Sequence, residues 1–201
     1  GLATEEGAVT ERLKEMMISL AKGGVGLIIS SHSYVSRQGQ AGPWQLGIYG
    51  DELVAGLREM TDAVHEQGGI IFMQLAHAGL FAAIKLSGEI PLFVSDLKGF
   101  EESPKKVITA ADIKGLVSAF AEAAGRAKKA GFDGVQIHAA HGYLLSQFLS
   151  PLFNRRTDSY GGAISGRMRL GTPTAAGTRD SRWPPPGAVL PWRCSSTIPA
   201  C

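Results

Sequence analysis

The sequence of 201 residues predicts an α/β fold, an incomplete (β/α)₈ TIM barrel with about three βα units. Three segments repeat the order of amphipathic helix, glycine and short apolar strand, which is typical of a parallel sheet with crossover helices. Long segments follow the predicted strands, whereas only a few residues lead from each helix into its strand, as in barrel enzymes. A doubly wound sheet is the alternative, but no G-x-G-x-x-G turn follows any strand.

The first repeat combines a helix at residues 13–21 with a buried strand at residues 25–29. Apolar side chains at helical spacing predict that helix, and we expect them all to face inward: Leu13, Met16, Met17, Leu20 and Ala21. Gly23 and Gly24 end it, because the position after a helix commonly needs a left-handed backbone.

The second repeat has an apolar helical stripe over residues 53–64 and a strand at residues 70–75. The third opens with Thr109 and Asp112, whose spacing resembles a capping box, and ends in a strand at residues 134–138. All three strands are continuous apolar runs, so we expect both of their faces to be covered.

Two long loops, Ser31–Gly50 and Ala76–Ile108, follow the first two strands. A complete barrel needs about 250 residues and eight strands. We therefore expect residues 1–170 to form part of a barrel that is incomplete at both ends. Such an open fragment exposes strand edges, so we expect it to be unstable or aggregated unless it pairs with another copy.

Residues 171–201 differ in composition from the rest of the chain. They hold six of the ten prolines and both cysteines, Cys194 and Cys201, but no lysine or glutamate. We interpret this tail as a non-homologous, disordered segment translated after a shift of reading frame, and a genuine Pro-rich tail is the alternative.

Composition excludes several classes of function. A net charge of +2 gives no support for binding nucleic acid or an anionic membrane surface, and no apolar run is long enough for a membrane span. Without a secretory signal or a cysteine in the first 170 residues, we expect a cytoplasmic enzyme. Homo-oligomer formation is left open.

Polar residues end two of the predicted strands, where a barrel places its active site. Gln74 ends the second strand, and His138, His141 and Tyr143 follow the third. Two imidazoles and a phenol within one turn can hold a carbonyl oxygen or an anion and deliver a proton beside it. One alternative is that these side chains only form hydrogen bonds within the loops. Another is that the two histidines bind zinc in a barrel hydrolase, although no paired carboxylate or thiolate accompanies them.

The run from Gly131 to Leu144, GFDGVQIHAAHGYL, resembles the signature of the Old Yellow Enzyme family, which contains ene-reductases and 2,4-dienoyl-CoA reductases. The resemblance continues through QFLSP and NRRTD to Tyr160-Gly161-Gly162, and the earlier run QLAHAG also matches the family. It extends from about residue 7 to residue 170. It implies an FMN-dependent TIM barrel that takes hydride from NADH or NADPH.

The resemblance also implies roles for individual residues. Gln74 would hydrogen-bond the pyrimidine edge of the flavin. His138 and His141 would hold the carbonyl oxygen of an enone or enoyl substrate, and Tyr143 would protonate the α-carbon as reduced flavin gives hydride to the β-carbon. The backbone near His32 would pass close to the flavin, in a turn where the family often has a small residue.

Some parts of the family's pattern are missing here. The strand beneath the flavin and the later strands that hold the FMN phosphate are absent, so an inactive fragment is the alternative function. After the paired glycines the family reads approximately S-x-E-N-R, whereas this chain has residues 163–167, AISGR. A relative that carries an iron–sulfur cluster stays open, because its cysteines would lie in the missing part.

Overall fold

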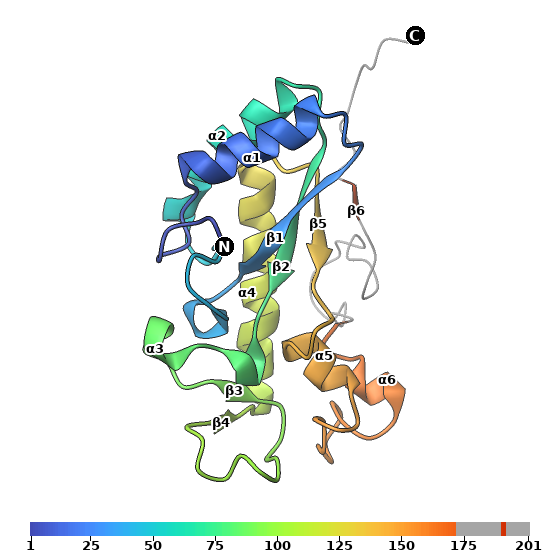
Figure 1. The fold of residues 1–201 in the computed structure, drawn as a ribbon. Helices are drawn as coiled ribbons and strands as arrows, with labels where there is room; N and C mark the ends of the chain where they lie inside the picture. Colours follow the sequence, from blue (N-terminus) through green and yellow to red (C-terminus); the bar gives the residue numbers. More distant parts are fainter. Residues whose placement is uncertain (172–189, 192–201) are drawn as a thin grey trace.

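The computed structural model describes residues 1–171 and 190–191 (Figure 1). Its main sheet has the order β1-β2-β5-β6. Strands β1 (Ile28–Tyr34), β2 (Ile71–Ala76) and β5 (Gly134–Ile137) are parallel neighbours, and β6 (Leu190–Pro191) pairs antiparallel with β5. The predicted parallel sheet is therefore present.

Three long helices alternate with the parallel strands: α1 (Glu11–Lys22), α2 (Val54–His65) and α4 (Ala110–Lys129). Figure 1 shows α4 lying behind the sheet, with α1 and α2 packed across its upper part. The predicted order of helix and strand is thus confirmed for all three repeats. One glycine after each of these helices adopts the expected left-handed backbone, with φ of +79° at Gly24, +73° at Gly68 and +85° at Gly131.

The capping box at the start of α4 is confirmed. The Thr109 side chain accepts a bond from the Asp112 N–H at 3.2 Å, and the Asp112 carboxylate accepts one from the Thr109 N–H at 2.8 Å. Two backbone donors that the helix itself leaves unpaired are satisfied in this way, which fixes where α4 begins.

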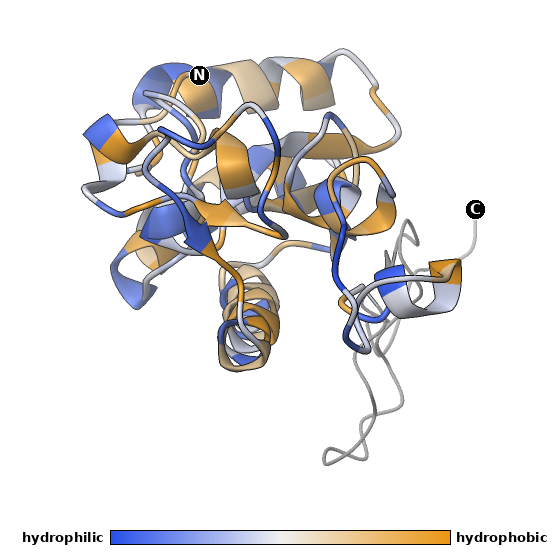
Figure 2. Cartoon of the chain, turned by 90° about the horizontal axis from the view of Figure 1, so that it is seen from below, coloured by the Kyte–Doolittle hydropathy of each residue, from blue (hydrophilic) through white to orange (hydrophobic). Residues whose placement is uncertain are grey.

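One face of the sheet supplies the hydrophobic core. Ile71, Met73 and Leu75 alternate along β2 and are fully buried against the apolar sides of α2 and α4. The strands and the inward sides of the helices carry most of the hydrophobic colour in Figure 2. The opposite face of the sheet, called here the inner face, carries the intervening residues of each strand.

The first strand differs from the prediction. It covers Ile28–Tyr34 instead of residues 25–29, so it continues into the segment that we expected to be a loop. Val25 and Leu27 precede it and are each 39% exposed, and Ile29 within it is 38% exposed. The prediction followed the apolar run, whereas pairing with β2 determines where the strand lies. We expected both faces of this strand to be buried, but only one face of β1 is covered.

The apolar stripe of α1 is also less buried than predicted. Leu13, Met17 and Ala21 are buried, but Met16 is 41% exposed and Leu20 is 38% exposed. Among the described elements, α1 packs mainly against α2 and β1. The part of the stripe that turns away from both neighbours therefore remains at the surface.

The segments that follow β2 and β5 lie at the bottom of Figure 1, beyond the carboxyl ends of the strands, and the segment that follows β1 runs beside the lower part of the sheet before it returns to α2. They contain the short elements η1 (Arg37–Gly39), η2 (Asp51–Leu53), η3 (Gly79–Phe81), α3 (Ile84–Ser87), β3 (Leu92–Phe93), β4 (Lys106–Val107), α5 (Leu144–Leu149) and α6 (Ile164–Arg167). Strands β3 and β4 form a separate parallel pair. Long loops at the carboxyl ends of the strands are thus confirmed.

Of the segment predicted to be a disordered tail, residues 190–191 form strand β6. The remainder of the predicted tail, including both cysteines, lies outside the described residues. Among residues 1–171 and 190–191, no helix has both the length and the apolar character that crossing a membrane requires.

Candidate active site

A row of polar side chains crosses the inner face of the sheet. His32 of β1 is in register with Gln74 of β2, which is in register with Gln136 of β5. The Gln74 side-chain Nε2 donates to Oε1 of Gln136 at 2.6 Å. Gln136 was not among the predicted site residues, because in the sequence it looks like one polar interruption of a strand.

A β-bulge places His32 in this row. The register between β1 and β2 shifts between Ile29 and His32, so β1 contains one residue more than β2 across this interval. The Ser30 hydroxyl accepts the bond from the Gln74 backbone N–H at 3.1 Å, which satisfies a donor that the interrupted ladder leaves free. In an uninterrupted ladder, His32 would lie opposite Leu75 and face the core.

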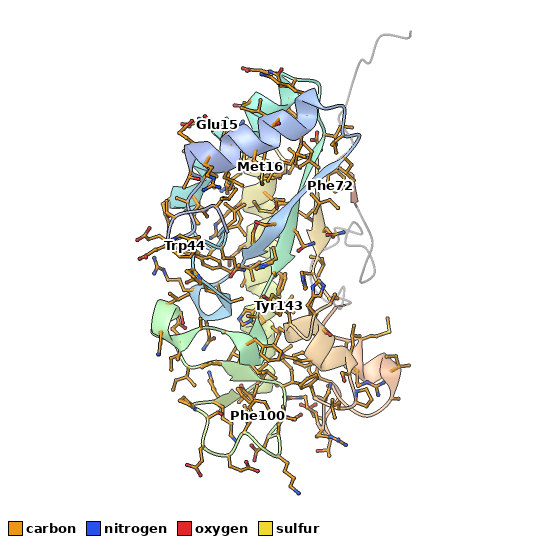
Figure 3. The ribbon with its side chains drawn as sticks, in the orientation of Figure 1. Glu15, Met16, Trp44, Phe72, Phe100 and Tyr143 are labelled. Carbon is orange, nitrogen blue, oxygen red and sulfur yellow. The ribbon has the colours of Figure 1, made fainter. Side chains whose placement is uncertain are left out.

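The turn after β5 brings His138, His141 and Tyr143 together, as predicted. The His138 backbone N–H donates to the Leu75 carbonyl at 2.9 Å, which extends the pairing of β5 with β2 by one residue. His141 has a φ of +54°, which is uncommon for a residue other than glycine and folds the turn back over the sheet. The Tyr143 ring then stacks on His138 with centroids 5.0 Å apart. Figure 3 shows Tyr143 near the lower ends of the strands, with Phe72 near their upper ends.

Backbone contacts fix the tautomers of the two histidines in this turn. The Ala140 N–H donates to Nδ1 of His138 at 3.4 Å, so the proton of His138 lies on Nε2. That Nε2 is 3.0 Å from Nδ1 of His141, which must accept the bond and therefore leaves the His141 proton on its own Nε2. His138 thus donates to His141, and the exposed His141 keeps its own Nε2–H free to donate.

His32 joins this cluster through its side chain. Its ring meets Tyr143 edge-on with centroids 5.6 Å apart, and His138 edge-on at 6.2 Å. The sequence resemblance pointed to the backbone of a turn at this position. The structure places His32 inside a strand, with its imidazole beside the other three predicted groups.

Burial keeps His32, His138 and Tyr143 neutral. Loss of solvent lowers the pKa of His138, and the neighbouring His141 and His32 lower it further. Burial and the neighbouring His141 likewise lower the pKa of His32. Burial raises the pKa of Tyr143, so the phenol keeps its proton at neutral pH. His32, His138 and Tyr143 are therefore neutral hydrogen-bond donors at neutral pH.

A buried glutamine that the sequence did not single out supports the turn. Gln147 of α5 is fully buried, and its Nε2 donates to the carbonyls of Ala78 and Gly142 at 3.1 and 2.6 Å. Its Oε1 accepts from the Leu80 N–H at 3.3 Å. The side chain thus joins the segment after β2 to the turn that carries His141 and Tyr143.

His77, from the run QLAHAG, lies below the site and not in it. It is 1% exposed, and its Nδ1 accepts a bond from the Gly79 N–H at 3.0 Å. Its Nε2 has no hydrogen-bond partner among the described residues. A side chain at Gly39 would collide with this ring, since its Cβ would lie 2.6 Å from Cδ2. His77 is therefore a packing residue between two of the loops.

The NRRTD run is structural as well. The Arg156 guanidinium donates to the carbonyl of Val94 at 3.0 Å and to that of Ile108, and it pairs with Asp158. Asn154 donates to the carbonyls of Phe148 and Tyr160, each at 2.8 Å. These contacts join the segment after β5 to the segment around β3 and β4.

No group of three or more His, Cys, Asp and Glu side chains among the described residues is arranged to hold a metal ion. The two histidines considered for zinc bond to each other instead.

The inner face at the carboxyl ends of the parallel strands thus gathers imidazoles, a phenol and amides. The sequence profile of the NADH:flavin oxidoreductase / NADH oxidase family matches residues 1–172, and the chain belongs to this family. The family binds FMN and uses NADH or NADPH.

Individual relatives agree with this assignment. The chain is 45% identical over 168 residues to an NADPH dehydrogenase of Bacillus subtilis (83% of this chain, 48% of that protein) and 42% identical over 172 residues to an NADH oxidase of Thermoanaerobacter brockii (84% and 26%). It superposes on an old yellow enzyme homologue from Zymomonas mobilis with a TM-score of 0.76 and 37% identity (84% and 50%). The fold is therefore an incomplete TIM barrel. The chain spans half or less of the length of these relatives.

The residues present fit one edge of FMN. The pyrimidine edge of a flavin carries both carbonyl oxygens and an N–H, so it needs donors and acceptors together, and a side-chain amide offers both. Gln74 uses one N–H on Gln136 and lies half-buried in the middle of the inner face. Gln74 would hold this edge, beside the imidazoles and the phenol.

Proposed function

We propose that the protein to which this segment belongs reduces the activated C=C bond of α,β-unsaturated carbonyl compounds. The observation that carries the proposal is the cluster of His138, His141 and Tyr143 on the inner face, next to Gln74. FMN, when bound, would accept hydride from NADH or NADPH and pass it to the β-carbon of the substrate.

The two histidines of the turn would stabilise the charge that develops on the substrate. Addition of hydride to an enone places negative charge on its carbonyl oxygen, and preorganised N–H donors lower the energy of that state. His141 offers its Nε2–H directly. His138 donates its Nε2–H to His141 in the free site, so the arriving oxygen would replace His141 as the acceptor.

Tyr143 would protonate the α-carbon. Its phenol is protonated at neutral pH, and stacking on His138 holds it over the inner face. Transfer of the phenol proton completes the reduction and leaves a phenolate, which the neighbouring imidazole N–H groups would stabilise until solvent returns the proton.

The test is an assay of NADPH-dependent reduction of 2-cyclohexen-1-one by the chain after incubation with FMN. Tyr143→Phe keeps the stacked ring and removes only the hydroxyl, so we expect it to lower the turnover number by roughly 10²–10⁴-fold. Tyr49→Phe, at a ring that stacks on Tyr34 away from this cluster, is the matched control. A Tyr143→Phe rate equal to that of the control would contradict the proposed acid. An FMN-loaded chain with no enone turnover would favour the inactive fragment.

A further inference from the structure

His32 differs from the other polar groups of the site because a buried side chain fixes which of its nitrogens carries the proton. Gln45 is 5% exposed and lies in the segment after β1. Its Oε1 accepts a bond from the Ala41 backbone N–H at 2.7 Å, and its Nε2 donates to the His32 backbone carbonyl at 3.2 Å. Since one partner can only donate and the other can only accept, the orientation of this amide is determined.

The same Gln45 Nε2 lies 2.7 Å from Nδ1 of His32. An amide N–H cannot accept, so Nδ1 must be the acceptor, and the proton of the neutral imidazole lies on Nε2. The ring meets His138 and Tyr143 edge-on on the inner face. The Nε2–H of His32 is therefore a third N–H donor of the site, in addition to those of His138 and His141. It forms no hydrogen bond with the turn after β5 or with the bulge.

This donor comes from a different strand than the first two. His138 and His141 follow β5, whereas His32 belongs to β1, with β2 between them. The two imidazoles nevertheless approach each other, with the His32 and His138 ring centroids 6.2 Å apart. A small ligand with two acceptors can therefore bond the histidines of the turn with one acceptor and His32 with the other.

We propose that His32 is a specificity-determining residue that binds a second hydrogen-bond acceptor of the substrate. The class favoured is a small alkene with carbonyl groups at both ends of the double bond, such as an ene-dione or a cyclic unsaturated imide. This inference rests on the proposed function for the reaction. The preference for a ligand with two acceptors depends only on residues of this chain. A binding measurement can therefore test it without any assay of the reaction.

The experiment compares two unreactive ligands with five-membered rings, N-methylsuccinimide with two carbonyls and cyclopentanone with one. The full chain, with its histidines labelled with ¹⁵N, is titrated with each ligand, and the imidazole signals are followed by NMR. We expect the free chain to show His32 as the Nε2–H tautomer. Both ligands should shift the signals of His138 and His141, and only the dicarbonyl should shift those of His32.

We expect N-methylsuccinimide to bind about fivefold more tightly than cyclopentanone, as one additional neutral hydrogen bond provides. His32→Phe keeps an aromatic ring against Tyr143 without a donor and should abolish this preference. His32→Gln retains an N–H group and should keep part of it. His65→Phe, on α2 outside the row, is the matched control and should leave it unchanged.

Equal dissociation constants in the wild type, a preference that survives in His32→Phe, or absence of binding by both ligands would overturn the proposal. If a variant fails to fold, the pattern of shifted histidine signals in the wild type decides. Failure of the proposed reaction can be distinguished from failure of this inference. A chain that does not reduce enones can still bind N-methylsuccinimide more tightly than cyclopentanone through His32.

Discussion

The side-chain amide of Gln147 donates a hydrogen bond to the backbone carbonyl of Gly142 at 2.6 Å, in the middle of the turn that carries the candidate catalytic groups. The same amide bonds the carbonyl of Ala78, after the neighbouring strand. His141, which has a positive φ, directly precedes Gly142 in this turn. The position of the imidazoles thus depends on one fully buried side chain of α5.

Gly79→Ala tests how closely the segment after β2 approaches Gln147. Gly79 has a φ of +62°, and its Cβ would lie 2.4 Å from Oε1 of Gln147. We expect the substitution to lower the free energy of unfolding by roughly 2 kcal/mol or more, because strain and collision act together. The measurement is urea denaturation followed by circular dichroism.

Gly115→Ala on α4 is the control for that substitution. Nothing lies within 4 Å of its would-be Cβ, and the residue is exposed in the middle of a helix. Alanine there should raise the free energy of unfolding by roughly 0.5–1 kcal/mol. If both variants change stability in the same direction, the close approach at Gly79 is wrong.

Gln74→Leu tests the contact to FMN. The substitution removes the amide and keeps similar volume, so we expect the dissociation constant of FMN to rise about tenfold through the lost hydrogen bonds. Titration of flavin fluorescence measures it. Gln67→Leu, at an exposed position after α2, should have no effect, and a Gln74→Leu affinity equal to that of Gln67→Leu would exclude Gln74 from the flavin site.

Arg156→Lys tests the structural reading of the NRRTD run. A lysine cannot reproduce the forked contacts to the carbonyls of Val94 and Ile108 together with Asp158. We expect a loss of about 1–2 kcal/mol in the free energy of unfolding, measured by thermal denaturation. The adjacent Arg155→Lys, at an exposed side chain, should change it by less than about 0.5 kcal/mol. Equal effects would show that the guanidinium contacts do not stabilise the fold.

The free energy of unfolding should decrease as the pH is lowered below the ordinary pKa of histidine. Burial lowers the pKa of His77 from 6.5 to about 4. Between these values the unfolded chain binds a proton that the folded chain does not, so acid favours unfolding. We expect His77 to contribute a loss of roughly 3 kcal/mol between pH 6.5 and pH 4.

His77→Asn isolates this contribution. The asparagine oxygen can accept the Gly79 N–H in place of Nδ1, but it does not titrate. The variant should be less stable at pH 7.5, because a smaller side chain fills the site, and its stability should depend less on pH between 6.5 and 4. An equally steep dependence in the variant would assign the effect to other groups.

The sequence predicted the helices and strands well where they follow helical or glycine patterns. It misplaced β1, because residues 30–33, SSHS, look like a loop and become a strand only when β2 pairs with them. The bulge that turns His32 toward the inner face is a property of two strands together. Neither the position of β1 nor the bulge can be recognised from the sequence of one segment alone.

The candidate site was partly predictable for a similar reason. His138, His141 and Tyr143 lie within six residues, so a single turn brings them together. Gln45, Gln136 and Gln147 act through contacts with partners that lie 4 to 69 positions away, and an isolated glutamine carries no signal of such a contact. The register of β5 beside β2, together with the Gln74 amide, could have identified Gln136.

The most direct test of the account is whether the chain retains FMN. The purified protein is incubated with FMN, desalted and examined by visible absorption, with circular dichroism to verify that it is folded. We predict that a flavin band near 450 nm, roughly where bound flavins absorb, stays with the protein in a ratio approaching one to one. A folded chain that leaves all of the flavin in the small-molecule fraction would contradict the claim that the inner face of β1, β2 and β5 is enough to bind it.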